Sequence, residues 1–451
     1  MFRQLMRGSA KLYAGYAVVM LAGLAQLKLL SIHLDKVHLG MYFALQSAIA
    51  LVAEMSKLGF PLVFGHYVPK MLAEKQDTGP LGFWAFILHL GSGVVTALVC
   101  LVLYFLVKGE FVAHLPLAVA MFFPMVHYSL LSSFILSSRR PGLYSLLNAI
   151  SGLSYALALF GLGSRLNLAS ALASGAVVYS TLSVVTWAVV RPAPGSTRIL
   201  KQIASYWKYA IMTTVLSPIF VYADRLIAAG FLSYEAVAVF GVARKIETVG
   251  RNLLGVPIDV LAPESSHAWL EEDRESFLSS LRRFTRLYLL WALAGIVLIP
   301  VLGKPAILLV SSDQYVSALP YLLVLWIGAT LSTLYYPYTT VARGVGNMRI
   351  FFLSDLLWTT SYLAFAFATT GPWGLWGLSL APVVASGVAL VFTRIAIFRF
   401  LRERRRGFWI EGACFAAASG FGLAGLLNPL WAIGSGVVVI AYGFWAILSR
   451  R

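Results

Sequence analysis

Long uncharged apolar runs are the feature that most constrains how this chain folds. Residues 81–107, LGFWAFILHLGSGVVTALVCLVLYFLV, contain no Asp, Glu, Lys or Arg. A helix that spans a bilayer needs about 20 mostly apolar residues, and this run exceeds that length. Over all 451 residues only 12% are charged, about half the fraction that is usual in soluble domains. The chain is therefore predicted to be an all-α integral membrane protein.

Fourteen predominantly apolar runs follow one another along the chain and are predicted to be transmembrane helices. The last two are separated only by Asn428-Pro429, so twelve or fourteen spans both fit. The first run follows Arg3, Arg7 and Lys11 and lacks a small-residue cleavage site, so we interpret it as a retained span. The predicted spans are 12–34, 39–62, 81–107, 111–137, 143–164, 168–190, 207–232, 235–262, 287–310, 318–341, 350–370, 374–398, 410–428 and 430–448.

The basic residues are distributed unevenly between the two sides that these spans define. Of the 35 Lys and Arg residues, 24 lie in loops or near span ends on one side, 4 lie in such positions on the other, and 7 lie deeper within spans. Cytoplasmic loops of membrane proteins are enriched in Lys and Arg, so both termini are predicted to be cytoplasmic. This asymmetry explains the net charge of +17 without a nucleic-acid partner. The outer loops, such as 35–38 and 371–374, are too short to fold into a domain.

Several kinds of chemistry lack their sequence signals. The chain has no Walker A motif, and its seven His residues lack the spacing of metal ligands. Cys100 and Cys414 both lie in apolar runs and are predicted to be buried thiols. We therefore expect no metal, no cofactor and no enzymatic activity.

An internal repeat of about 195 residues predicts two six-helix lobes. Residues 28–48 resemble residues 225–245, and the junction at 137–144 resembles the one at 343–350. Because six spans return the chain to the same side, the lobes should form a parallel repeat around a central cavity. The expected division is an N-terminal lobe at 1–190, a cytoplasmic linker at 191–206, a C-terminal lobe at 207–398, and a basic loop with two extra spans at 399–451.

Charged residues within the predicted spans are the candidate functional residues, because a charge at mid-bilayer costs about 2.5–3.5 kcal/mol on insertion scales. They concentrate in the first two spans of each lobe. Glu54 and Lys57 lie three positions apart, and Glu247 lies three from Arg244 and four from Arg251, so each set shares a helix face. The predicted substrate-binding residues are Lys28, Arg225, Arg244, Lys245 and Arg251, and the predicted ion-coupling or structural-pairing residues are Glu54, Lys57, Asp224 and Glu247.

Structural roles for these charges stay open. The two clusters can hold the bundle together through ion pairs, and Lys28 is close enough to the outer surface to extend its ammonium group into water. Asp355 is interpreted as a hydrogen-bonded bundle residue or a proton site. The segment 264–286 has apolar residues at helical spacing, and it predicts an amphipathic helix on the cytoplasmic surface.

The chain resembles the polysaccharide-export flippases, a branch of the multidrug/oligosaccharidyl-lipid/polysaccharide exporter superfamily. The resemblance lies in residues 38–75, in residues 206–246 with Asp224-Arg225-Leu226 before the outer turn, and at Gly344-x-Gly346-Asn347. It implies a transporter in the bacterial inner membrane that flips polyprenyl-pyrophosphate-linked oligosaccharides to the outer leaflet by alternating access. It implies as partners the lipid-linked glycan, membrane lipids and other polysaccharide-assembly membrane proteins.

Three rival functions remain to be weighed. An ion-coupled multidrug exporter of the same superfamily would favour acids in its cavity, whereas bases predominate here. A peptidoglycan-precursor flippase is a variant of the leading prediction. A membrane glycosyltransferase, polymerase or ligase would need a larger outer loop than this chain has.

Overall fold

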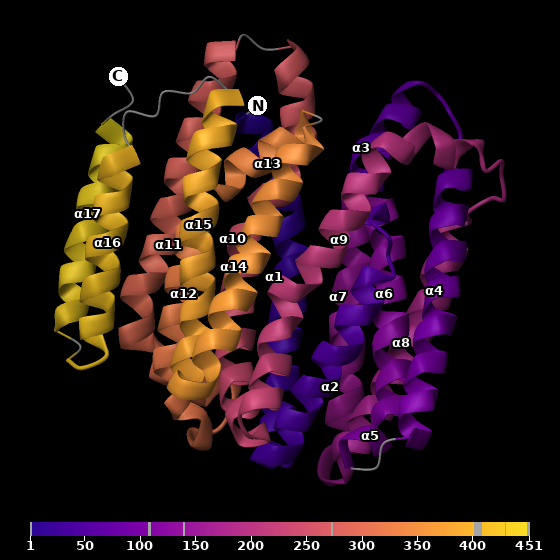
Figure 1. The fold of residues 1–451 in the computed structure, drawn as a ribbon, viewed down its shortest axis with the longest axis horizontal. Helices are drawn as coiled ribbons and strands as arrows, with labels where there is room; N and C mark the ends of the chain where they lie inside the picture. Colours follow the sequence, from indigo (N-terminus) through magenta and orange to yellow (C-terminus); the bar gives the residue numbers. More distant parts are fainter. Residues whose placement is uncertain are drawn as a thin grey trace. The chain divides into compact units, whose positions relative to one another are not determined.

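The computed structural model describes residues 2–106, 110–138, 140–271, 274–345, 347–400, 408–428 and 430–448. These residues form seventeen α-helices and two short 3₁₀ helices, η1 (Gly163–Arg165) and η2 (Asp313–Ala318) (Figure 1). The first nine helices are α1 (Phe2–His33), α2 (Lys36–Met55), α3 (Phe60–Ala73), α4 (Gly79–Leu106), α5 (Glu110–Ala113), α6 (Leu115–Ser137), α7 (Pro141–Leu162), α8 (Leu168–Val190) and α9 (Arg198–Phe231). The others are α10 (Tyr234–Glu271), α11 (Arg274–Val310), α12 (Leu319–Ser332), α13 (Tyr336–Gly344), α14 (Met348–Trp373), α15 (Leu375–Phe400), α16 (Phe408–Gly425) and α17 (Trp431–Leu448).

Every predicted span coincides with a helix or with a broken pair of helices, which confirms an all-α membrane fold of about fourteen helices. Within the described ranges, nine helical segments are long and apolar enough to cross a membrane. The bent helix α9 adds a tenth, and Gly79–Val95, Ile410–Gly425 and Trp431–Gly443 are shorter apolar helices. Helix α9 bends by 44° between its two parts and contains Pro218, which removes a backbone donor from the helix.

Three spans that were predicted to be continuous are broken: 111–137 breaks at His114 near its start, and two others break well inside their length. In the run 39–62, helix α2 ends at Met55 and α3 begins at Phe60. In the run 318–341, helix α12 ends at Ser332 and α13 begins at Tyr336. A proline at the first or second position opens each second helix, where its missing N–H is tolerated. Leu58 and Gly59 adopt positive φ angles of 52° and 77°, which turn the backbone out of the helical conformation.

The prediction of a surface helix at 264–286 is also wrong for the residues of that segment that the structure describes. The segment instead continues α10 to Glu271 and begins α11 at Arg274. Phe277 and Leu281 are buried against Leu261 and Tyr338, so this apolar stripe packs on protein. Lys108, Arg139, Gly346 and the basic loop 401–407, all used in the sequence interpretation, lie outside the described residues.

The chain packs as two compact units. One comprises Lys11–Ala238, and the other comprises Val239–Arg451 with the first ten residues. In the first unit α6 packs against α2, α3, α4, α7 and α8, and α9 packs against α2 and α3. Helix α9 begins at Arg198, within the segment that was expected to be a linker. The division into lobes at 1–190 and 207–398 stays a prediction.

The second unit is organised around α11, α12 and α15. Helix α15 packs against α12 and α14, and α11 contacts α12, α16 and α17. The final two helices lie side by side as a hairpin (Figure 1). Trp326 anchors this unit by donating a hydrogen bond from Nε1 to the carbonyl of Ala292 at 2.8 Å.

Candidate functional site

The break between α2 and α3 forms the first candidate site, and we call residues Glu54–Gly59 the α2–α3 joint. Lys57 Nζ lies 2.7 Å from Glu54 Oε2 and donates a hydrogen bond to Ser129 Oγ of α6 at 3.0 Å. Lys57 is buried and Glu54 is half-buried. The i, i+3 spacing read from the sequence is thus realised as an ion pair, which makes the pair electrically neutral.

Side chains from α4 and α9 hold the rest of the joint. Ser56 Oγ donates to the carbonyl of Ala53, so it must accept its second hydrogen bond, at 2.8 Å, from His89 Nδ1 of α4. Trp207 Nε1 of α9 donates to the carbonyl of Leu58 at 2.6 Å. These bonds satisfy backbone and side-chain groups that the helix break leaves without helical partners.

Asp224 and Arg225 on α9 form the second candidate site in the first unit. Both are buried, with exposed fractions of 1% and 6%. Asp224 Oδ1 accepts the backbone N–H of Arg225 at 2.7 Å, and Arg225 Nη1 lies 3.4 Å from Ser47 Oγ of α2. The guanidinium carbon also lies 5.8 Å from the centre of the Phe43 ring, within the range of a cation–π contact.

Helix α10 carries the third candidate site, which we call the α10 cluster and define as Arg244, Glu247 and Arg251. Arg244 Nη1 lies 3.0 Å from Glu247 Oε2, and Arg251 Nε lies 3.1 Å from Glu247 Oε1. Arg244 and Glu247 are 3% and 1% exposed. One carboxylate is shared by two guanidinium groups, so the α10 cluster retains a formal charge of +1.

Lys28 and Lys245, the two remaining candidates, are half-buried on α1 and α10. The structure therefore brings together Glu54 with Lys57, and Arg244 with Glu247 and Arg251. Sequence reasoning missed Ser47, Phe43 and Ser129, which contact the candidate cations. A serine or phenylalanine in an apolar span carries no signal of such a role, because the contact depends on which helices pack together.

The fold is shared with solved membrane transporters. The lipid II flippase MurJ in an inward closed conformation matches with a TM-score of 0.73 and 12% identity, covering 99% of this chain and 100% of that one. An outward-facing multidrug MATE transporter matches with a TM-score of 0.67 and 17% identity over 88% and 96% of the two chains. A transporter from Pyrococcus furiosus, described by the reversed polarity of its binding pocket, matches with a TM-score of 0.67 and 16% identity over 89% and 96%.

No family model and no curated protein matches the chain in sequence. At identities of 12–17%, the structural likeness bears on architecture. The chain has the all-helical membrane fold seen in transporters of the multidrug/oligosaccharidyl-lipid/polysaccharide superfamily.

Proposed function

We propose that this protein is a transporter that flips polyprenyl-pyrophosphate-linked oligosaccharides from the cytoplasmic to the outer leaflet of the bacterial inner membrane. The observation that carries the proposal is the charge balance of the candidate residues. Six are cationic and three are anionic, and both Glu54 and Glu247 already have cationic partners. An excess of buried positive charge favours an anionic ligand group, such as a pyrophosphate.

Arg225 is the residue we expect to matter most for the substrate. A guanidinium group presents a planar fork of donors that suits phosphate oxygens, and it stays charged when it is buried. Its contacts with Ser47 and Phe43 place it in the interior of the first unit. We propose that in alternating access cations of each unit attract the pyrophosphate, Arg225 and Lys28 in the first unit and Lys245 and the α10 cluster in the second.

The fold supports this proposal, and it is also consistent with two related functions. The lipid II flippase is a neighbour in structure, which favours a peptidoglycan precursor as an alternative lipid-linked substrate. The MATE neighbours favour ion-coupled drug export. Compensated carboxylates suit a cationic drug poorly, so the flippase function fits the described charges better. Lipid-linked glycan, membrane lipids and other polysaccharide-assembly membrane proteins are the partners under this proposal.

The test is mass spectrometry of polyprenyl-pyrophosphate glycans in cells with and without the gene. We expect a complete lipid-linked unit to accumulate on the cytoplasmic side when the gene is deleted. The Arg225→Ala variant should reproduce that accumulation at normal abundance in the membrane, and Arg225→Lys should restore part of the export. Lys201→Ala, which removes an exposed cation, is the matched control.

Two results would contradict the proposal. If the deletion strain has unchanged lipid-linked glycans, the proposal of a flippase is wrong. Altered efflux of cationic drugs would then support a multidrug exporter. If Arg225→Ala exports normally, the assignment of Arg225 to the binding site is wrong, but the proposed substrate is not contradicted.

A further inference from the structure

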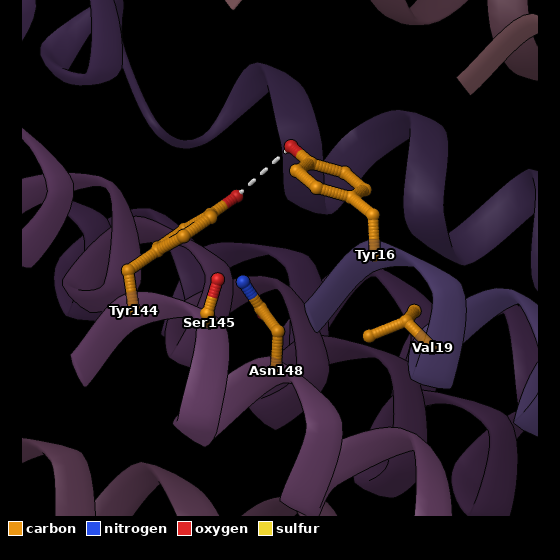
Figure 2. Close-up of a pocket in the computed structure, with 5 residues that line it drawn as sticks. All are labelled: Tyr16, Val19, Tyr144, Ser145 and Asn148. Atoms are coloured by element: carbon orange, nitrogen blue, oxygen red, sulfur yellow. Dashed lines mark hydrogen bonds between the residues drawn. The ribbon is translucent and has the colours of Figure 1, made fainter. Parts of the chain in front are cut away.

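A cavity of about 100 Å³ lies between α1 and α7, and none of the charged candidate residues lines it. Its lining consists of Tyr16 and Val19 from α1 and Tyr144, Ser145 and Asn148 from α7 (Figure 2). All five belong to the unit Lys11–Ala238. A cavity that holds one water needs about 10–15 Å³ on this measure, so this one has room for a larger group.

Four of the five lining side chains are polar. The hydroxyls of Tyr16 and Tyr144 lie 3.4 Å apart and point toward each other (Figure 2). Asn148 Oδ1 accepts a hydrogen bond from Tyr128 at 3.2 Å, and this leaves the amide nitrogen turned toward the cavity (Figure 2). Ser145 Oγ is buried and has no hydrogen-bond partner among the described residues. A buried hydroxyl without a partner is costly, so the site suits a ligand that supplies one.

The chemistry of this lining selects the class of ligand. No lining residue is charged, so a phosphate would find no counter-charge here. Tyrosine and serine hydroxyls both donate and accept hydrogen bonds, and an amide nitrogen donates two. The tyrosine rings add apolar faces beside these polar atoms. Sugar rings match this combination, because their hydroxyls donate and accept and their C–H groups are apolar.

We propose that the α1–α7 cavity is a binding site for a neutral sugar residue. This inference rests on the proposed function, since the sugar would belong to the lipid-linked oligosaccharide. Tyr16 follows Arg3, Arg7 and Lys11 in the sequence, and Arg140 directly precedes α7; both basic segments are predicted to be cytoplasmic. The cavity would therefore hold the glycan before flipping, while the cations discussed above attract the pyrophosphate.

The test measures binding of free sugars to the purified full-length protein in detergent. Saturation-transfer NMR with glucose, galactose and N-acetylglucosamine should detect at least one of them, and inorganic pyrophosphate should not displace it. The double variant Tyr16→Phe/Tyr144→Phe keeps both rings and removes both hydroxyls. We expect it to weaken the sugar affinity about tenfold, as the loss of one or two hydrogen bonds predicts.

Ser145→Ala provides a second, smaller change at the same cavity, and Tyr67→Phe is the control for a tyrosine outside it. Sugar affinity that is unchanged in both cavity variants, or no sugar binding by the wild type, would overturn the inference. The outcome is independent of the glycan analysis in cells. If the variants lose sugar binding but the deletion strain has normal glycans, the cavity assignment stands and the proposed flippase function is wrong.

Discussion

The α2–α3 joint and the α10 cluster occupy corresponding places in the sequence repeat, but they are built differently. At the joint the helix breaks, and side chains of α4, α6 and α9 hold the freed groups. Through the α10 cluster the helix is continuous from Tyr234 to Glu271, and the ion pairs run along one face. The joint is electrically neutral, whereas the α10 cluster keeps an excess positive charge. The two sets of charges that the predicted repeat aligns therefore lie in different local structures.

The largest effect is expected from Glu247→Gln in the α10 cluster. This change removes the carboxylate charge that Arg244 and Arg251 share, and breaking a buried ion pair in this way costs about 3–5 kcal/mol. Thermal unfolding of the purified protein should show a large fall in the unfolding temperature. Glu235→Gln, at an exposed position in the first turn of the same helix, is the matched control.

If Glu247→Gln unfolds at the wild-type temperature, the α10 cluster contributes little to stability. The contrast with the joint would then rest on charge alone.

The second effect tests whether the joint depends on its backbone conformation. Gly59 has φ 77°, where a side chain costs about 1–2 kcal/mol, and an added Cβ would lie 2.5 Å from the backbone carbon of Ala210 in α9. Gly59→Ala should therefore lower the unfolding temperature. Gly255→Ala on α10 meets nothing within 4 Å, and a glycine inside a helix is about 1 kcal/mol worse than alanine.

The two glycine variants should thus shift stability in opposite directions. Equal shifts would mean that the break between α2 and α3 does not need glycine.

The third effect concerns the neutral pair itself. Glu54→Gln or Lys57→Met alone leaves a charge without its partner, and a hydrogen bond to a charged group is worth about 1.5–3 kcal/mol. The double variant removes both charges and should recover most of that loss. A double-mutant cycle of unfolding temperatures measures this coupling. The coupling is expected to be smaller than the loss at Glu247, because the Glu54 side chain is 26% exposed. Additive losses would show that the two side chains do not stabilise each other.

The sequence predicted the positions of the spans and the contacts along single helices, but it did not predict the helix breaks or the contacts between helices. Span positions followed from hydropathy, since burial in a membrane leaves long apolar runs, and the spacings of Glu54 with Lys57 and of Glu247 with Arg244 predicted contacts along one helix. The broken helices were missed although Gly59-Phe60-Pro61 and Tyr336-Pro337 were visible, because a hydropathy window averages over a turn of four residues. The contacts of His89, Ser129 and Trp207 with the joint depend on long-range packing, which no local pattern encodes.

The smallest effect is expected where the two helices begin. Asp35 caps α2, its Oδ1 accepting the backbone N–H of His38 at 2.8 Å, whereas Ser233 Oγ accepts the N–H of Ala236 before α10 at a longer 3.3 Å. Replacing a capping residue by alanine typically costs about 1 kcal/mol, so Asp35→Ala should lower the unfolding temperature slightly, and Ser233→Ala should lower it less.

The pH dependence separates the charge of Asp35 from its hydrogen bond. The backbone hydrogen bond from His38 holds the pKa of Asp35 below its usual value, so ionised Asp35 stabilises the fold above the ordinary aspartate pKa of about 3.9. That contribution is lost as the pH falls through the lowered pKa of the folded state. Asp35→Asn keeps a capping side chain but cannot titrate, so its difference from the wild type should shrink below about pH 4, as the carboxylate of the wild type takes up a proton. His38 Nδ1 lies 2.9 Å from Asp35 Oδ1, so the interaction of Asp35 with this imidazole also contributes to the difference at higher pH. A difference that persists at low pH would show that the cap acts through shape and hydrogen bonding alone, as it would at Ser233, and the two helix starts would then be equivalent.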